Sequence, residues 1–198
     1  MYKQKLCLSL NGDFGLSDSE QIRLFKRTGF EAFTGHWNVG DDDRIIESAK
    51  VGKSEGMIFN AFHAPWNHTA DMWDENEKDD AEQGVKDLKH FLDLCAKLEI
   101  PVMVSHVYVG FDEPCVPTEF GLENYGKVID HAEKLGIKIA FENTEGEEGL
   151  NALLTTYHDR ECVGFCWDSG HEMCYNYSKD LLALYGDKLL VTHINDNL

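Results

Sequence analysis

Short apolar runs that alternate with amphipathic segments constrain this chain more than any other feature of its sequence. The runs have the length of buried strands. They begin near Lys5, Glu31, Met57, Pro101, Ile137, Cys162 and Lys188. Between them, apolar residues recur at spacings of three and four, the pattern of a helix with one buried face. Strands that alternate with helices predict a parallel sheet, because each helix returns the chain to the end where the next strand starts.

Boundary signals support this division into βα units. Ser17 and Glu20 have the spacing of a capping box, and Gly29 follows the helical pattern that they open. Pro101 and Gly136 stand directly after two longer apolar stripes and predict the ends of those helices. Each interval between two apolar runs therefore corresponds to one βα unit.

Polar residues follow the apolar runs at the same relative place. They are Asn11, His36, His63, His106, Glu142, Asp168 and His193. In a closed barrel these strand ends converge on one mouth, whereas an open sheet spreads them along a line. No glycine-rich phosphate loop follows the first run. We therefore predict a (β/α)8 TIM barrel of about seven parallel strands with outer helices, a single domain over residues 1–198 that lacks the last βα unit.

Composition excludes several classes of function. The chain of 198 residues has 36 Asp and Glu against 18 Lys and Arg, a formal charge of −18, which disfavours nucleic acid as a partner. No apolar window is long enough for a membrane span, and the N-terminus has no secretory core or cleavage site. Six scattered cysteines indicate reduced thiols and a cytoplasmic protein. We expect Cys162 and Cys166 to fill the core from one face of a strand.

Two long insertions, Asn67 to about Asp80 and Tyr108 to about Thr118, follow the third and fourth runs. On the mouth side of a barrel, long loops serve as lids or substrate walls. The first insertion is also acidic enough to be a solvated surface loop. Trp66 and Trp73 favour the lid.

Three consecutive strand ends carry groups that bind metals. Glu142, Asp168 and His193 each end an apolar run, where an ionisable group is costly to bury unless it is paired or bound to metal. A single Glu or His in such a place is more often a capping, salt-bridged or hydrogen-bonded residue. Three in succession predict one shared divalent cation, Mn²⁺, Mg²⁺, Co²⁺ or Zn²⁺.

These motifs resemble the xylose isomerase-like TIM barrels, which include sugar phosphate isomerases, ketose 3-epimerases, inosose dehydratases and endonuclease IV. The family holds its metal with a Glu, an Asp and a His after strands five, six and seven, and with a Glu after strand eight. Glu142, Asp168 and His193 match the first three ligands. His171, in an Asp-Xaa-Xaa-His pattern, is similar to a histidine that contacts metal-bound substrate or a second metal. The eighth strand is missing, which suggests a fragment or completion of the barrel by another chain.

The resemblance implies proton transfer at a carbon next to a carbonyl, through an enediolate. Glu142 and His171 are the expected catalytic residues. A small sugar or polyol substrate is expected to contact the following residues: His63, His106, Trp37, Trp66 and Asn143, with Phe111 as a further apolar wall. For the aromatic residues, core packing is the alternative.

Three classes of function are consistent with this sequence. The first is a sugar isomerase or epimerase, which the ligand set and the aromatic residues support. The second is another enzyme of the same barrel, either an inosose dehydratase-type lyase or an endonuclease IV-like hydrolase, although the negative charge opposes binding of DNA. The third is a non-catalytic metal-binding remnant that scaffolds another subunit, and the missing strand favours it. As partners we expect a homo-oligomer or another chain that completes the barrel.

Overall fold

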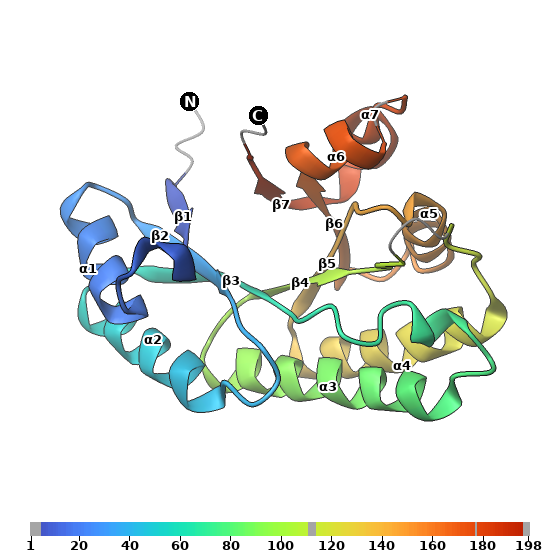
Figure 1. Cartoon of the computed structure of the whole chain (residues 1–198), viewed down its shortest axis with the longest axis horizontal. Helices are drawn as coiled ribbons and strands as arrows, with labels where there is room; N and C mark the ends of the chain where they lie inside the picture. The colour runs from blue at the N-terminus through green and yellow to red at the C-terminus, as the bar shows by residue number, and fades with distance from the viewer. Residues whose placement is uncertain (1–4, 111–113, 177, 196–198) are drawn as a thin grey trace.

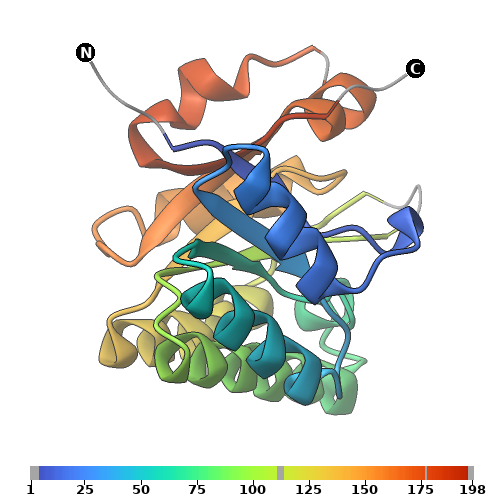
Figure 2. The same ribbon diagram turned by 90° about the vertical axis from the view of Figure 1, so that its left-hand side faces the viewer.

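The computed structural model describes residues 5–110, 114–176 and 178–195. Seven parallel strands form one sheet in the order of the sequence. They are β1 (Cys7–Ser9), β2 (Ala32–His36), β3 (Ile58–His63), β4 (Val102–His106), β5 (Lys138–Glu142), β6 (Val163–Asp168) and β7 (Leu189–His193). Each begins within two residues of the expected start. The sheet curls, and its two edge strands lie on the same side of the molecule (Figures 1 and 2).

Helices connect successive strands and pack on the outer face of the sheet (Figure 1). The α-helices are α1 (Asp18–Arg27), α2 (Asp42–Ser54), α3 (Lys78–Lys97), α4 (Glu119–Leu135), α5 (Glu147–Thr156), α6 (Ser169–Tyr175) and α7 (Leu181–Tyr185). Short 3-10 helices occur at η1 (Gly12–Phe14), η2 (Asp71–Trp73) and η3 (Gly186–Lys188). Within the described residues β1 and β7 do not pair with each other. This is the expected fold, seven parallel strands of a TIM barrel with helices on the outside.

The expected helix boundaries are confirmed. Ser17 and Glu20 form both hydrogen bonds of a capping box at the start of α1. Gly136 ends α4 with a φ of 69°, in the left-handed region that glycine adopts without strain. None of the described helices is long and apolar enough to cross a membrane.

Alternation along the strands separates an inner from an outer set of side chains. A small buried cluster faces the inside of the curled sheet: Ala61, Val104, Ala140 and Cys166. The larger core, which contains Met103, Phe141 and Phe165, packs the other face against the helices. Because successive residues of a strand point to opposite faces, the residues two places after the inner cluster point inward at the carboxyl ends of the strands.

The two cysteines near β6 show where the expected arrangement is wrong. Cys162 and Cys166 are both buried, as predicted, with 7% and 0% of their surface exposed. Cys162, however, precedes the strand and contacts the carbonyl of Ile129 in α4, whereas Cys166 belongs to the inner cluster. They do not share a face, because the residue before a strand need not follow the alternation within it.

Candidate functional site

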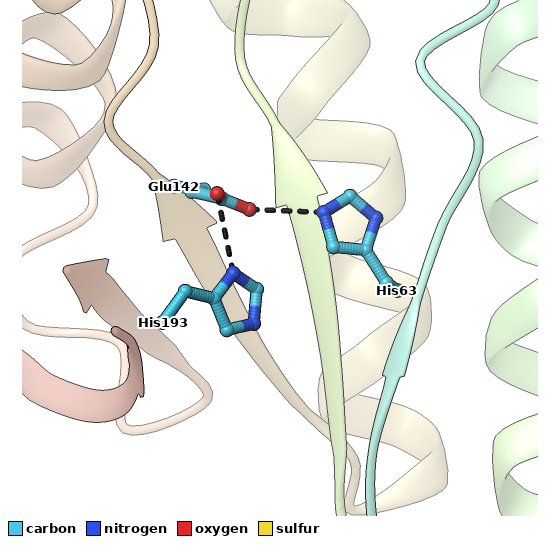
Figure 3. A group of neighbouring side chains, drawn as sticks. All are labelled: His63, Glu142 and His193. Atoms are coloured by element: carbon cyan, nitrogen blue, oxygen red, sulfur yellow. Dashed lines mark hydrogen bonds and ion pairs between the residues drawn. The ribbon is translucent and has the colours of Figure 1, made fainter. Parts of the chain in front are cut away.

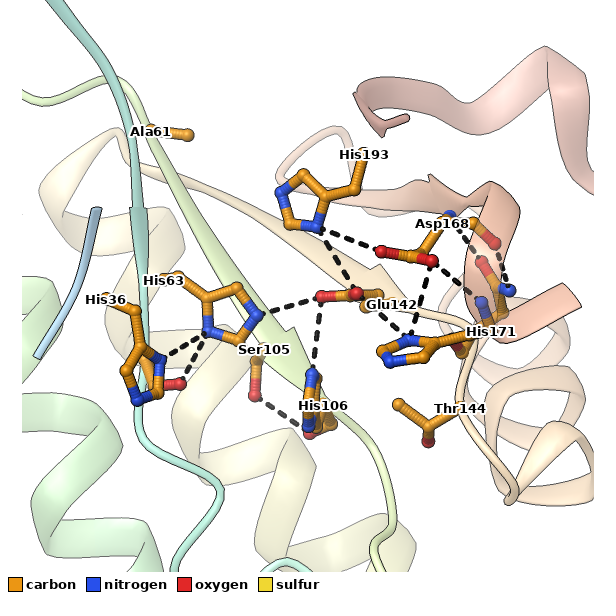
Figure 4. A network of polar contacts seen from close by, with 12 residues as sticks. His36, Ala61, His63, Ser105, His106, Glu142, Thr144, Asp168, His171 and His193 are labelled. Carbon is orange, nitrogen blue, oxygen red and sulfur yellow. Dashed lines mark hydrogen bonds and ion pairs between the residues drawn. The ribbon is translucent and has the colours of Figure 1, made fainter. Parts of the chain in front are cut away.

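Glu142 lies at the centre of a group of imidazoles. Its carboxylate ends β5 and has 1% of its surface exposed. Figures 3 and 4 show the contacts of its oxygen atoms. Oε2 lies 3.0 Å from His63 Nε2 and 3.5 Å from His106 Nε2. Oε1 lies 3.2 Å from Nδ1 of both His171 and His193. A buried carboxylate is thus surrounded by four groups that can donate to it or share a cation with it.

Strand register produces this convergence. His36 lies opposite His63 in the β2–β3 pair, His106 opposite Glu142 in the β4–β5 pair, and Asp168 opposite His193 in the β6–β7 pair. Residues paired in parallel strands point to the same face, so these side chains share the inner face at the carboxyl ends of the strands. The structure therefore brings together residues that are far apart in the sequence.

Burial and the imidazoles act in opposite directions on the carboxylate. Burial alone would raise the pKa of Glu142, but hydrogen bonds from the four histidines lower that pKa well below its ordinary value. Burial likewise opposes the charged form of His63 and His171, and contact with Glu142 outweighs it and raises both pKa values. For His106 burial dominates and the pKa is lowered. The network thus contains an ionised carboxylate whose charge nearby imidazoles compensate.

The donor set fits a divalent cation. Two groups of three residues each offer one ligand atom per residue, with these atoms within 4.8 Å of one another. They are His63, Glu142 and His193, and His106, Glu142 and His171. Nδ1 of His106 is buried without a hydrogen-bond partner. Imidazole nitrogens with a carboxylate suit ions such as Zn²⁺, Mn²⁺ or Co²⁺.

Asp168 lies next to this carboxylate and imidazole cluster. Its Oδ2 is 3.7 Å from His193 Nδ1 and accepts a hydrogen bond from Asn195 Nδ2 at 2.6 Å. Its Oδ1 accepts the backbone N–H of His171 at 2.8 Å, which caps α6. The group of three ligand atoms that contains Glu142 and His193 thus has His63 as its third member, where the sequence suggested Asp168. Binding of one metal by Glu142, Asp168 and His193 together stays a prediction.

Asn143 occupies a different place from the one expected of a substrate-binding residue. Its side chain is fully buried. Oδ1 accepts the backbone N–H of Asp168 at 2.8 Å, and Nδ2 donates to the backbone carbonyl of Asp168 at 2.9 Å. Its own carbonyl lies 3.0 Å from Nδ1 of His171. The side-chain amide thus connects the ends of β5 and β6, and both of its polar atoms are engaged within the protein.

Trp37 and Trp66, the two tryptophans expected to contact the substrate, differ in burial and in their neighbours. Trp66 is 46% exposed, and its ring stacks on His36 at 5.0 Å and on His106 at 5.8 Å between centroids. Trp37 is 1% exposed and stacks on Phe62 in the core, so it lies outside the site. The structure supports the core-packing alternative for Trp37 and places Trp66 beside the histidines.

Part of the first insertion packs against the protein, around Met72 and Trp73, whereas residues 74–80 are exposed. Trp73 is 4% exposed and donates from Nε1 to the carbonyl of Val107 at 3.1 Å, an arrangement that differs from an open lid. A pocket of about 440 Å³ lies between the two insertions. It is lined by Ala70, Asp71, Trp73, Asp74, Glu75, Tyr108, Pro114, Val116 and Thr118. Phe111 lies outside the described residues.

One residue near the site was missed as a functional candidate. His36 ends β2, has its Nδ1 3.4 Å from Nδ1 of His63 and stacks on Trp66. Burial, followed by the neighbouring His63 and His106, lowers its pKa to about 4. Its position after the second apolar run was the signal that could have identified it.

Comparison with known proteins identifies a matching family and a curated relative. The family described as xylose isomerase-like TIM barrel matches residues 22–198. A curated relative, the uncharacterized protein y4fM of Sinorhizobium fredii, is 34% identical over 128 residues. That match covers 59% of this chain and 41% of the relative, so this chain spans less than half of that protein.

Several solved structures share the fold at low sequence identity. The 3-keto-D-glucoside 4-epimerase YcjR of E. coli has a TM-score of 0.75 at 18% identity, over 98% of this chain and 80% of that one. A D-allulose 3-epimerase of Methylomonas sp. has a TM-score of 0.72 at 15% identity, over 98% and 74%. The IolI protein with a bound zinc atom has a TM-score of 0.68 at 18% identity, over 98% and 73%. Together with the family match over most of its length, the sheet and its helices show that this chain belongs to the xylose isomerase-like TIM barrel family.

Proposed function

We propose that this chain is a divalent-metal-dependent isomerase or epimerase of a small sugar, sugar phosphate or related hydroxy-carbonyl compound. The observation that carries the proposal is the buried Glu142 carboxylate among four imidazoles at the carboxyl ends of the strands. Enzymes with this fold keep their chemistry at that end of the barrel. The epimerases of similar structure support the choice of reaction.

The residues proposed to hold the ion are Glu142, Asp168 and His193, with His63 as a further ligand because it belongs to the compact group. The ion would be Mn²⁺, Mg²⁺, Co²⁺ or Zn²⁺, and the zinc atom of the similar IolI structure supports a site for a divalent metal. A bound ion of this kind polarises a carbonyl group and stabilises the negative charge that develops on it.

The residues of the chain would have distinct roles in proton transfer. Glu142 would accept a proton from the carbon next to the substrate carbonyl and return it. His171, whose ring is 31% exposed, would orient a substrate hydroxyl. Asn143 would position Asp168 through its two hydrogen bonds, and the exposed ring of Trp66 would contact the CH face of the sugar.

A second candidate is metal-dependent hydrolysis of a phosphodiester, of the endonuclease IV type. The observation in its favour is that both compact groups share Glu142, as a carboxylate bridging two ions would. The formal charge of −18 opposes it, because DNA would be repelled. Incubation of the metal-loaded protein with DNA that contains an abasic site tests it, and absence of cleavage removes this candidate.

Hydrogen exchange in D2O tests the leading proposal. The chain is loaded with each of the four metals and incubated with a panel of ketoses, and incorporation of deuterium next to the carbonyl is followed by NMR. We expect exchange and isomerisation, and we expect Glu142→Gln to abolish both. Glu148→Gln is the matched control, because Glu148 lies exposed in the first turn of α5. Unchanged exchange in Glu142→Gln contradicts the assignment, and no exchange with any metal favours the non-catalytic alternative.

Three further properties of the chain are also proposed. The six cysteines, all of which lie in the described residues, form no disulfide, which supports a cytoplasmic location where thiols stay reduced. Within the described residues, the outer edges of β1 and β7 pair with no strand, which supports a homo-oligomer or completion of the barrel by further polypeptide. We also propose that residues 1–198 form a single domain, because one seven-stranded sheet runs through the described residues.

A further inference from the structure

We infer that the substrate of this site is an uncharged polyhydroxy compound without a phosphate group, an inference that rests on the proposed function. The observation behind it is the placement of the charged residues relative to the carboxyl ends of the strands. Phosphate monoesters are bound in proteins by Arg and Lys side chains, or by helix N-termini with free backbone N–H groups. Both kinds of donor can be located in this chain.

The segments that lead from a strand to the next α-helix contain no basic residue. They are residues 10–17, 37–41, 64–77, 107–118 and 143–146, and none of the 18 Lys and Arg of the sequence falls in them. Each of these segments contains at least one Asp or Glu. The described parts of these segments lie at the carboxyl ends of the strands, and Asp or Glu occurs in residues 10–17, 37–41, 64–77 and 143–146. The charge that this chain contributes around the site is therefore negative, which disfavours a phosphate dianion.

Among the described residues, few basic side chains lie near this end of the barrel, and those that do have acidic neighbours. Arg44, in the first turn of α2, forms two hydrogen bonds with the buried Asp18. Lys179, in the connection after α6, contacts the carboxylate of Glu147. Lys78 opens α3 on the outer layer of helices, next to two acidic residues. Two of these cations are thus engaged with buried carboxylates, and the third belongs to the outer layer.

The helix N-termini do not replace the missing cations. Each helix from α1 to α6 has an acidic side chain in its first turn. Such a side chain occupies the positive end of the helix dipole, where a phosphate would otherwise bind. At α6, which starts directly after β6, the N-cap is the Asp168 carboxylate itself.

The exposed surface next to the histidines suits a neutral sugar instead. The ring of Trp66 stacks on His36 and His106, which fixes its orientation, and 46% of its surface remains exposed. Such a ring binds the CH face of a sugar by apolar contact and contributes no positive charge. Hydroxyl groups of a neutral ligand can then contact the imidazoles and carboxylates below it.

Matched substrate pairs test this inference. D-fructose, D-allulose and D-tagatose are each compared with their terminal phosphate monoesters in the deuterium-exchange assay with the metal-loaded chain. We expect kcat/KM for the free sugar to exceed that for its ester by at least about tenfold, because like charges close together are strongly unfavourable. A preference for the ester overturns this inference and leaves the isomerase proposal standing. Absence of exchange with both members of every pair overturns the proposed function, and this inference with it.

A charge variant separates electrostatics from fit. Trp66→Lys and Trp66→Gln remove the same ring, and only the first adds a positive charge at the mouth. We expect the ratio of ester to free-sugar kcat/KM to be about threefold higher in Trp66→Lys than in Trp66→Gln, the size expected for an exposed ion pair. Equal ratios in the two variants would show that charge at the mouth does not exclude the ester, and would overturn the inference.

Discussion

The side chain of Asn143 hydrogen-bonds both backbone polar groups of Asp168, accepting from its N–H at 2.8 Å and donating to its carbonyl at 2.9 Å. This pair extends the contact between β5 and β6 by one residue beyond the strands' own hydrogen bonds. The carboxylate of Asp168 in turn caps α6 and lies 3.7 Å from His193. A buried amide whose two polar atoms are engaged within the protein can therefore fix the position of a proposed metal ligand.

Replacement of Asn143 by Ala is predicted to reduce both stability and metal affinity. The change leaves two buried backbone groups of Asp168 without partners, which costs about 2–4 kcal/mol of the free energy of unfolding. Loss of a residue that orients a ligand lowers metal affinity by about 10–100-fold. Urea denaturation and calorimetric titration with Mn²⁺ measure the two effects. Asn38→Ala, at an exposed position, is the control, and wild-type values for Asn143→Ala would contradict the role assigned here.

Substitution of Trp37 and substitution of Trp66 are predicted to affect different properties, the first stability and the second binding of the sugar. Trp37 is buried against Phe62, so Trp37→Ala should lower the free energy of unfolding by about 3–5 kcal/mol through loss of packing. Trp66 is exposed beside the histidines, so Trp66→Ala should leave stability almost unchanged and raise KM for the sugar. Denaturation curves and steady-state kinetics on the folded fraction distinguish them. A Trp66→Ala variant with unaltered KM would remove Trp66 from the proposed binding surface.

Tyr125 is predicted to limit stability at alkaline pH. Its hydroxyl is fully buried and donates to the carbonyl of Val107 at 2.7 Å, and burial raises its pKa above the ordinary value near 10. The folded state therefore keeps this proton when the unfolded state releases it. The stabilisation is fully present below pH 10 and is lost as pH rises through 10 toward the folded-state pKa.

The free energy of unfolding, measured in urea between pH 8 and pH 11, checks this expectation. Tyr125→Phe should be less stable than wild type by about 1 kcal/mol near neutral pH, because one hydrogen bond is lost while Trp73 still donates to the same carbonyl. The stability of the variant should then fall less steeply above pH 10. Identical slopes in the two proteins would show that Tyr125 is not the group responsible.

Local signals made much of the fold predictable. The capping box of Ser17 and Glu20 and the glycine at 136 act within a few residues, so the sequence indicated these helix boundaries directly. The same holds for the strand-end positions of Glu142 and His193, because a parallel sheet places the carboxyl ends of all its strands at one edge.

What the sequence did not reveal depends on alternation and tertiary packing. Asn143 and Trp37 each follow an inward-facing strand-end residue by one position, so neither continues the inner face and both are buried. The burial of Trp73 depends on its contact with Val107, which lies beyond β4 and 34 residues away along the chain. The direct contact between His63 and Glu142 likewise depends on the curvature of the sheet, because the sequence placed both residues at one barrel mouth without specifying which side chains meet.

The central claim is that Glu142, Asp168 and His193 bind one divalent cation, and anomalous X-ray diffraction from crystals grown with excess Mn²⁺ or Zn²⁺ tests it most directly. We predict an anomalous peak within about 2.0–2.3 Å of a donor atom from each of the three residues. A peak that contacts other residues instead, or no peak near the Glu142 carboxylate in the presence of excess metal, would contradict it.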